Sequence, residues 1–298
     1  MSTAALAPAR REGELRRLEL AVTHRHDGLL QGDHLGLVPA AGTEAGEGRT
    51  YAPGDDVRRI DWNLSARSGS IHVRDTIADR ELETWLVVDG SASLDFGTAD
   101  CEKRDRALAA AAAFGFLTNR SGNRVAATVL DGERVAVVPP RSGRDAVMSI
   151  LHRLDTRERV EAGDGPTLAD AIRRARLAST RRGFLVVISD FLDASDWPGE
   201  LRSAAARHQV VGVHITDPRE HELPPVGLLT LVDPERGRRV EVQTSDRRLR
   251  ERFAAAAADQ HEQIVGRIRG AGAAHLSLST DRDWMRDIVR YASRRHLR

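Results

Sequence analysis

The sequence Leu-Glu-Thr-Trp-Leu-Val-Val-Asp-Gly-Ser-Ala-Ser, residues 82–93, joins an apolar run to a polar loop. An apolar run of this length, closed by Asp89, Gly90 and Ser91, predicts a strand that is buried inside a sheet. The Ala-rich segment that follows, residues 102–119, has the length and composition of a helix that covers such a sheet. A buried strand followed by a covering helix is the repeating unit of a parallel α/β fold.

The same alternation of strand and helix continues to the end of the chain. Further helices are expected at residues 144–154, 168–178, 197–207, 246–270 and 283–294, and further buried strands at 184–188, 210–215 and 275–278. Two hairpins are expected as well, one around Asp131-Gly132, a dipeptide that tolerates positive φ angles, and one at residues 228–242. We therefore expect an α/β fold with a doubly wound, mostly parallel sheet and helices on both faces.

The chain before residue 81 has a different character. Apart from a helical candidate at residues 12–22, it shows little periodicity and contains many glycines and charges. Residues 40–48 hold too few apolar side chains to order themselves. The sequence therefore predicts an irregular N-terminal region, residues 1–80, followed by an α/β domain, residues 81–298.

Composition and charge argue against several classes of protein. Lys and Arg total 45 against 44 Asp and Glu, so the net charge of +1 gives no global field for nucleic acid or anionic lipid. A single cysteine, Cys101, cannot form an internal disulfide, and no run of eighteen apolar residues is present. Paired arginines are scattered and balanced by acids, as on solvated helix faces, and they are Arg173-Arg174, Arg181-Arg182, Arg247-Arg248 and Arg294-Arg295. We expect a cytoplasmic protein with no transmembrane segment and no nucleic-acid partner.

Oxygen-bearing side chains stand at three places where the predicted pattern ends a strand or starts a helix. Asp89, Ser91 and Ser93 share the loop after the first buried strand, Asp190 follows a later buried strand, and Thr167 starts a helix. The loops at the carboxyl ends of parallel strands converge on one edge of a sheet, where ligands bind. Carboxylates and hydroxyls suit a small, hard cation with octahedral coordination. These five side chains therefore predict a site for Mg²⁺ or Mn²⁺.

This pattern resembles the metal-ion-dependent adhesion site of von Willebrand factor A (vWA) domains, and the resemblance extends from about residue 83 to the C-terminus. It implies that Ser91, Ser93 and Thr167 contact the metal through their hydroxyls, while Asp89 and Asp190 hold its waters. The sixth coordination position is then left for a carboxylate from a protein partner. The resemblance thus implies binding of a partner without catalysis.

A second set of motifs lies in the N-terminal region. It consists of Arg-Thr-Tyr-Ala-Pro-Gly-Asp-Asp at residues 49–56, Arg-Arg-Ile-Asp-Trp at residues 58–62 and Ser-Ala-Arg at residues 65–67. Their order, ahead of a vWA-like half, resembles the family called domain of unknown function 58 (DUF58). Members of that family are often encoded beside MoxR-type AAA+ ATPases. The resemblance therefore implies a metal-bearing adaptor that presents or docks target proteins for an ATP-driven remodelling machine.

Two interpretations of these N-terminal motifs remain open. The Pro-Gly pair is typical of a type II turn that could present carboxylates, and nearby arginines can pair with them. The residues concerned are Tyr51, Asp55, Asp56, Arg58, Arg59, Asp61, Trp62 and Arg67. One interpretation is a salt-bridge cluster that pins the N-terminal region to the sheet, with Trp62 as its buried anchor. The other is a docking surface for the partner.

Other functions compete with metal-dependent binding. A phosphohydrolase of the haloacid dehalogenase type would use Asp89, but it needs a second carboxylate where this chain has Ser91. A serine hydrolase would use Ser91 with His208, His214 or His275 as its base, although the glycines of a nucleophile elbow are absent around this serine. A metal-free scaffold would use the hydroxyls only as helix caps. We expect no catalytic activity.

Overall fold

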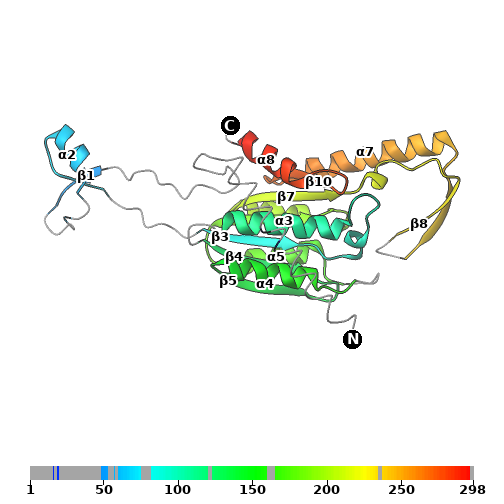
Figure 1. Cartoon of the computed structure of the whole chain (residues 1–298), viewed down its shortest axis with the longest axis horizontal. Helices are drawn as coiled ribbons and strands as arrows, with labels where there is room; N and C mark the ends of the chain where they lie inside the picture. The colour runs from blue at the N-terminus through cyan, green and yellow to red at the C-terminus, as the bar shows by residue number, and fades with distance from the viewer. Residues whose placement is uncertain are drawn as a thin grey trace.

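The computed structural model describes residues 48–52, 57, 60–74, 82–119, 123–159, 165–233 and 237–295, together with Arg16 and Glu19. Its central sheet consists of β3 (Glu83–Val88), β4 (Arg124–Leu130), β5 (Val135–Arg141), β6 (Gly183–Ser189), β7 (Gln209–Thr216) and β10 (Ala274–Ser279). The strands lie in the order β10-β7-β6-β3-β4-β5 (Figure 1). Neighbouring strands are parallel, except that β5 is antiparallel to β4. The expected α/β fold with a mostly parallel sheet is confirmed.

Helices cover both faces of this sheet. One face carries α3 (Lys103–Thr118), α4 (Arg144–Asp155) and α8 (Trp284–Arg295), and the other carries α5 (Leu168–Ala178), α6 (Trp197–Ala205) and α7 (Arg247–Gly270). Alternate residues of β3 enter the two cores: Leu86 and Val88 pack beneath the first group, and Trp85 and Val87 beneath the second. A strand that is buried on both faces has to be apolar on both, and for this reason the end of β3 is an unbroken apolar run.

Local sequence patterns locate several element boundaries correctly. Asp246 caps α7, because its carboxylate accepts hydrogen bonds from the backbone N–H groups of Arg248 and Leu249 at 2.8 and 3.4 Å. Gly132, in the turn between β4 and β5, has a φ of 84°, as an Asp-Gly hairpin turn predicts. The second expected hairpin pairs β8 (Leu228–Val232) with β9 (Arg239–Gln243) in a separate two-stranded sheet.

The order of the central strands determines where a ligand can bind. From β3 the chain builds β4 and β5 on one side, and it then returns to add β6, β7 and β10 on the other. The loops after β3 and β6 therefore leave the sheet in opposite directions, which opens a crevice at the carboxyl ends of these neighbouring strands. Asp89 and Asp190 are the first residues of the two loops.

The N-terminal region contains local structure among its described residues. β1 (Gly48–Thr50) pairs antiparallel with β2 (His72–Arg74), and α2 (Trp62–Ser68) lies between them in sequence. Figure 1 shows this small unit apart from the main sheet. Arg16 and Glu19 are both helical, in agreement with the helix expected at residues 12–22.

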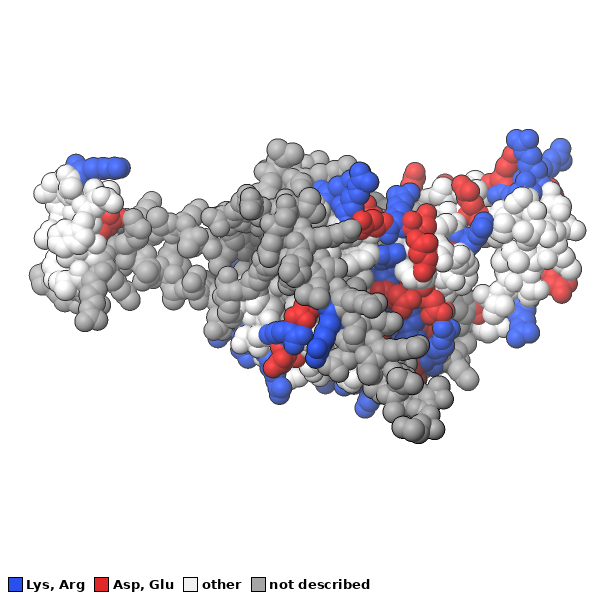
Figure 2. Space-filling view, in the orientation of Figure 1, with Lys and Arg blue, Asp and Glu red and all other residues white. Residues whose placement is uncertain are grey.

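The described helices and the charges on the surface can be compared with the composition. None of the helices in the described ranges is long and apolar enough to cross a membrane. Basic and acidic side chains are interspersed over the face shown in Figure 2. On this face the nearly equal totals of 45 basic and 44 acidic residues are not separated into one basic and one acidic patch.

Candidate metal centre

The carboxyl ends of β3 and β6 lie side by side and fix Asp89. The two strands pair in parallel, with Val88 opposite Ile188. The ladder continues for one more residue, because the Asp89 N–H donates to the Ile188 carbonyl at 2.9 Å. Ser189 Oγ then donates to Asp89 Oδ2 at 2.5 Å, and both side chains are buried. The first carboxylate of the predicted site is therefore held by the strand next to its own.

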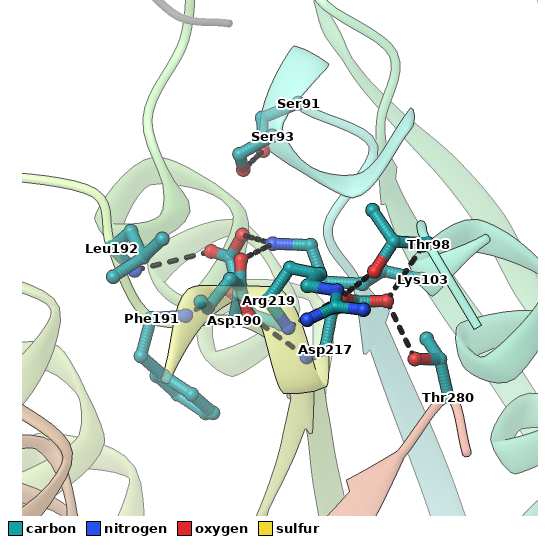
Figure 3. Close-up of polar contacts among 12 residues, drawn as sticks. Ser91, Ser93, Thr98, Lys103, Asp190, Phe191, Leu192, Asp217, Arg219 and Thr280 are labelled. Carbon is teal, nitrogen blue, oxygen red and sulfur yellow. Dashed lines mark hydrogen bonds and ion pairs between the residues drawn. The ribbon is translucent and has the colours of Figure 1, made fainter. Parts of the chain in front are cut away.

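The hydroxyl oxygens of Ser91 and Ser93 lie close together in the loop after β3. The Ser91 N–H donates to Asp89 Oδ1 at 2.9 Å, which tightens the loop before the short 3₁₀ helix η3 (Ala92–Asp95). The two Oγ atoms lie 3.0 Å apart (Figure 3). Two oxygen ligands at adjacent corners of an octahedral Mg²⁺ site, each about 2.1 Å from the ion, are separated by about 3.0 Å. The spacing of the serine hydroxyls thus fits a pair of metal ligands.

Gly90 lets this loop pass close to the end of β4. A Cβ atom at position 90 would lie 1.9 Å from the Leu130 carbonyl oxygen and 2.9 Å from Arg157 Cδ. Gly90→Ala is therefore expected to lower the free energy of unfolding by about 1–3 kcal/mol, because the loop or the strand has to move. Urea denaturation of the full chain measures this difference.

Gly266→Ala is the matched control for Gly90→Ala. Nothing lies within 4 Å of a Cβ atom at position 266, in the C-terminal part of α7. Alanine is favoured over glycine in a helix by about 1 kcal/mol, so this variant should be as stable as the unmodified chain or more so. A Gly90→Ala chain as stable as Gly266→Ala would contradict the close approach of the loop to Leu130.

Asp190 belongs to a buried ion-pair network with Lys103, the first residue of α3. Lys103 Nζ donates to Asp190 Oδ2 at 2.8 Å (Figure 3) and to Glu220 Oε1 at 2.5 Å. The Lys103 and Asp190 side chains are only 1% and 2% exposed. Burial alone would raise the pKa of Asp190, but the Lys103 ammonium and hydrogen bonds from Ser93 and the Leu192 N–H hold it below its usual value. Asp190 therefore stays ionised beside the serine pair.

Asp89 and Asp190 place two buried carboxylates close enough for their charges to interact. Burial and the charge of Asp190 raise the pKa of Asp89 to about 6, although hydrogen bonds from Ser189 and Ser91 act in the opposite direction. Two neighbouring buried carboxylates repel each other, and a divalent cation between them relieves the repulsion. The two carboxylates are therefore compatible with a bound cation.

Thr167 caps a helix and retains a free lone pair. Its Oγ1 accepts a hydrogen bond from the Asp170 N–H at 3.2 Å, and the Asp170 carboxylate accepts from both the N–H and the hydroxyl of Thr167. This capping box satisfies the first turn of α5. A hydroxyl oxygen has two acceptor lone pairs, so one remains after the bond from Asp170. A role as helix cap and a role as metal ligand are therefore compatible at Thr167.

A cavity of about 680 Å³ opens over the predicted ligands. Ser91, Ser93, Thr167 and Asp190 all line it, while Asp89 lies buried behind the loop. Much of the remaining wall comes from α7, from the loops after β6 and β7, and from the end of β4 with the turn that follows it. The structure thus brings four of the five predicted oxygen ligands to one opening at the carboxyl edge of the sheet.

Lys103 is the residue of this site that sequence reasoning missed. It is the only lysine in the chain, because every other residue among the 45 basic ones is arginine. A compact ammonium fits between two carboxylates where a planar guanidinium would need more room. The lone lysine in an arginine-rich sequence was the feature that could have revealed it.

The histidines considered as bases for a serine hydrolase occupy different places. His208 precedes β7 and therefore lies at the opposite edge of the parallel sheet from Ser91. His214 lines the cavity, and His275 lies near the start of β10. A serine nucleophile would bond to its histidine base, whereas the Ser91 hydroxyl hydrogen-bonds to Ser93 Oγ.

The N-terminal motif residues fall only partly within the described chain. Asp55, Asp56, Arg58 and Arg59 lie outside the described residues. The Tyr51 N–H donates to the Ile71 carbonyl at 2.7 Å, which extends the pairing of β1 with β2. Asp61 caps α2 by accepting hydrogen bonds from two backbone N–H groups, and Arg67 is exposed in the last turn of that helix.

The expectation that Trp62 is a buried anchor is wrong. Its side chain is 70% exposed. It lies in the first turn of α2, a helix of seven residues with no buried residue. A helix this short has no packed face of its own for an aromatic ring to bury against. Exposed tryptophans are common at binding surfaces, so this finding leaves the docking interpretation open.

Comparison with known sequences places the chain close to a group of mycobacterial proteins. The family described as "Protein of unknown function DUF58" matches residues 47–263. Uncharacterized protein Rv1480 of Mycobacterium tuberculosis is 53% identical over 282 residues, which cover 94% of this chain and 89% of that protein. Uncharacterized protein Mb1516 of Mycobacterium bovis gives the same values. Uncharacterized protein MAV169 of Mycobacterium avium is 43% identical over 158 residues, which are 53% of this chain and 93% of that protein.

Several solved structures resemble the chain more distantly. A conserved hypothetical protein, BatB from Bacteroides thetaiotaomicron, has a TM-score of 0.44 at 14% identity and covers 72% of this chain and 99% of its own. An aerotolerance-related membrane protein from Bacteroides fragilis has a TM-score of 0.46 at 15% identity with the same coverage. The SpRpn10 VWA domain has a TM-score of 0.40 at 12% identity and covers 70% of this chain and 94% of its own.

Proposed function

Because the chain belongs to the DUF58 family of proteins of unknown function, we propose that it is a metal-dependent protein-binding module without catalytic activity. Asp89, Ser91, Ser93, Thr167 and Asp190 would hold Mg²⁺ or Mn²⁺, directly or through water. When bound, the ion would supply an open coordination position for a carboxylate of a protein partner. The resemblance of these residues to the adhesion site of vWA domains supports this proposal.

The observation that carries the proposal is the pair of serine hydroxyls. Their oxygens lie 3.0 Å apart at the mouth of a cavity, next to the ionised Asp190. A serine loop that served only to cap η3 would use the Ser91 hydroxyl on the backbone of that helix, yet Ser91 makes no side-chain cap bond. The Ser91 hydroxyl bonds to its neighbour's hydroxyl instead of capping the helix, which suits the two oxygens to a shared ligand.

The proposed partner is a MoxR-type AAA+ ATPase, for which the chain would present or dock target proteins. Membership of the DUF58 family supports this part of the proposal. A cytoplasmic setting goes with it, supported by the single cysteine, Cys101, which is free.

Titration of Mn²⁺ into the full chain, followed by electron paramagnetic resonance, tests the metal site. One tightly bound Mn²⁺ per chain is expected, with competition by Mg²⁺. Ser93→Ala should weaken the affinity for Mn²⁺. Loss of a residue that only supports a metal ligand costs about 10–100-fold in affinity, and loss of a ligand should cost at least as much. Ser203→Ala is the matched control, because its hydroxyl bonds to the Gly199 carbonyl on the exposed side of α6 and should leave binding unchanged.

Two outcomes would count against this site. If the wild-type chain binds no Mn²⁺, the protein is a metal-free scaffold. If Ser93→Ala binds Mn²⁺ as tightly as Ser203→Ala does, the ion lies elsewhere.

The partner is tested separately with a purified MoxR-type ATPase, whose binding should require Mg²⁺ and be lost in Ser93→Ala. Binding of the ATPase that persists in EDTA would show that this interaction does not depend on the metal.

A further inference from the structure

The β8–β9 hairpin exposes apolar side chains on a sheet of only two strands. It forms a sheet of its own, and Figure 1 shows it beyond the central sheet, beside the start of α7. None of its strand residues is buried. A hairpin of two strands is marginally stable in water, whereas three or more strands that share an apolar face are stable. The hairpin is therefore suited to take on further strands.

One face of the hairpin consists of Leu and Val alone. Leu229 lies opposite Val242, and Leu231 lies opposite Val240. Residues that lie directly opposite each other in an antiparallel pair share a face, so these four side chains form one apolar surface. The other face contains Leu228 and Val232, which are 64% and 54% exposed. A strand added beside β8 would thus meet apolar side chains on both faces.

The hydrogen bonds of the hairpin determine which backbone groups of β8 point away from β9. The Thr244 N–H donates to the Gly227 carbonyl at 2.7 Å, and the Asp233 N–H donates to the Arg238 carbonyl at 2.8 Å. Along antiparallel strands, residue pairs that exchange hydrogen bonds alternate with pairs that do not. Residues 229 and 231 therefore bond to β9. The residues whose N–H and C=O groups point outward are Leu228, Thr230 and Val232.

The outer edge of β8 lacks the features that protect the other edges of the hairpin and the central sheet. Its sequence, Leu-Leu-Thr-Leu-Val, contains no charge. In contrast, β9 carries Arg239 and Glu241, and β5 contains Pro139 and Pro140. The remaining edge strand, β10, has no exposed side chain. Charges, prolines and covering elements are the usual means of keeping an edge strand from pairing with another chain. Among these described strands, β8 is thus the one open to a further strand.

We propose that the chain forms a symmetric dimer in which β8 pairs antiparallel with β8 of a second copy. The two-fold axis lies beside Thr230, because the sequence of β8 is nearly symmetric about this residue. Leu228 then lies opposite Val232 of the second copy, and on the other face Leu229 lies opposite Leu231 of the second copy. Each outward-pointing residue of β8 bonds both its N–H and its carbonyl across the interface. The two hairpins become one four-stranded sheet.

A second copy fits this edge because the strand complements itself. Self-pairing places no like charges opposite each other, and it sets Thr230 against its own copy, which is one of the favourable cross-strand pairs. The interface is isologous, with the same surface used on both copies. A contact through one short strand is small, so the dimer forms in a concentration-dependent way. The dimer uses no residue of the candidate metal centre, and it does not rest on the proposed function.

Sedimentation equilibrium of the full chain at increasing concentration tests the dimer. The average mass should rise from 32.7 kDa toward twice that value. Thr230→Pro should weaken dimerisation at least about 10-fold, because it removes an outward N–H from both copies while the bonds between β8 and β9 remain. Glu241→Pro is the matched control, since Glu241 lies opposite Thr230 and its N–H points to the other edge. This variant should dimerise as the unmodified chain does.

A charge exchange at position 230 tests the position of the two-fold axis. In the proposed dimer this residue meets its own copy, so Thr230→Lys and Thr230→Glu should each dimerise at least about 10-fold more weakly than the unmodified chain, because like charges are opposed. An equimolar mixture of the two variants should form a mixed dimer, since opposite charges then meet. Circular dichroism checks that every variant folds.

Three results would overturn the dimer. The first is a chain that stays at the mass of a monomer up to about 1 mM, which would leave the β8 edge to a strand from a different protein. The second is Glu241→Pro weakening dimerisation as much as Thr230→Pro does. The third is a charge-exchanged mixture that pairs no better than its separate components. Asp89→Ala should lose Mn²⁺ but dimerise normally, so failure of the metal site is distinguishable from failure of the dimer.

Discussion

Lys103→Met is expected to lower the free energy of unfolding by about 3–5 kcal/mol, because it removes one partner from a buried ion-pair network. Methionine retains the length of the lysine stem but leaves Asp190, 2% exposed, without its counter-ion. For a domain of this size each kcal/mol lowers the melting temperature by about 2–4 °C, so the transition should fall by roughly 6–20 °C. Urea denaturation and calorimetry of the full chain measure the two quantities.

The control for Lys103→Met removes the same charge from the surface. Arg247 pairs with Glu251 on α7, and both side chains are largely exposed. Exposed pairs contribute at most about 1 kcal/mol, so Arg247→Met should change stability little. If the two variants lose equal stability, the Lys103 network does not contribute as a buried ion pair. Without the Lys103 ammonium, burial is left to raise the pKa of the Asp190 carboxyl. A group whose folded-state pKa is raised gains stability as it is protonated, so the stability deficit of Lys103→Met should shrink as the pH is lowered.

Asp217 is the position of the second large effect. Its buried carboxylate accepts hydrogen bonds from the N–H and hydroxyl of Thr98, from the N–H of Arg219 and from the hydroxyl of Thr280, at 2.5–2.9 Å (Figure 3). It therefore ties the loop before α3 to the ends of β7 and β10. Asp217→Ala is expected to lower the free energy of unfolding by at least about 3 kcal/mol, since hydrogen bonds to a charged group contribute about 1.5–3 kcal/mol each.

The pH dependence of this effect gives a second measurement. Burial would raise the pKa of Asp217, but the hydrogen bonds from Thr98, Thr280 and Arg219 hold it below 3.8. A carboxyl group with a lowered folded-state pKa stabilises the fold above its unfolded value, and it loses that contribution as the pH falls through the folded one. The stability gap between the unmodified chain and Asp217→Ala should therefore be constant from pH 7 to about pH 5 and narrow below pH 4.

Asp259→Ala is the control for Asp217→Ala, because Asp259 is exposed in the middle of α7. Alanine is the better helix former, so this variant should lose nothing. A stability difference between the unmodified chain and Asp217→Ala that is absent at pH 7, or that increases in acid, would contradict the role assigned to the Asp217 hydrogen bonds.

The parts of the fold that the sequence predicts are those governed by local patterns. The apolar run that ends at Val88 indicates a strand buried on both faces, and Asp131-Gly132 indicates the hairpin, because each pattern follows from a few consecutive residues. The positions of Asp89 and Asp190 could be predicted for the same reason, since the carboxyl ends of parallel strands meet at one edge. A pattern of oxygen donors at strand ends therefore contains enough information to locate the candidate site.

The parts that the sequence does not predict depend on contacts between distant residues. Lys103 bonds to side chains 87 and 117 residues away, so no spacing along the chain indicates its partners. The rings of His214, His261 and His275 likewise lie together only because β7, α7 and β10 are packed together. One of the two interpretations of the N-terminal motifs made Trp62 the buried anchor of a salt-bridge cluster. Burial requires a surface to pack against, and a helix of seven residues without a buried residue offers none.

Lys103 also makes the chain an unusual substrate for proteolysis. A protease specific for lysine has a single target bond, after residue 103, and cleavage there yields fragments 1–103 and 104–298. The lysine side chain that such an enzyme must grasp is 1% exposed and engaged by two carboxylates. Cutting therefore requires α3 to come away from the strand ends, and the rate of this one cleavage reports how often that happens in the folded population. The chain thus carries its own probe of opening at the centre of the molecule, with no label or engineered site.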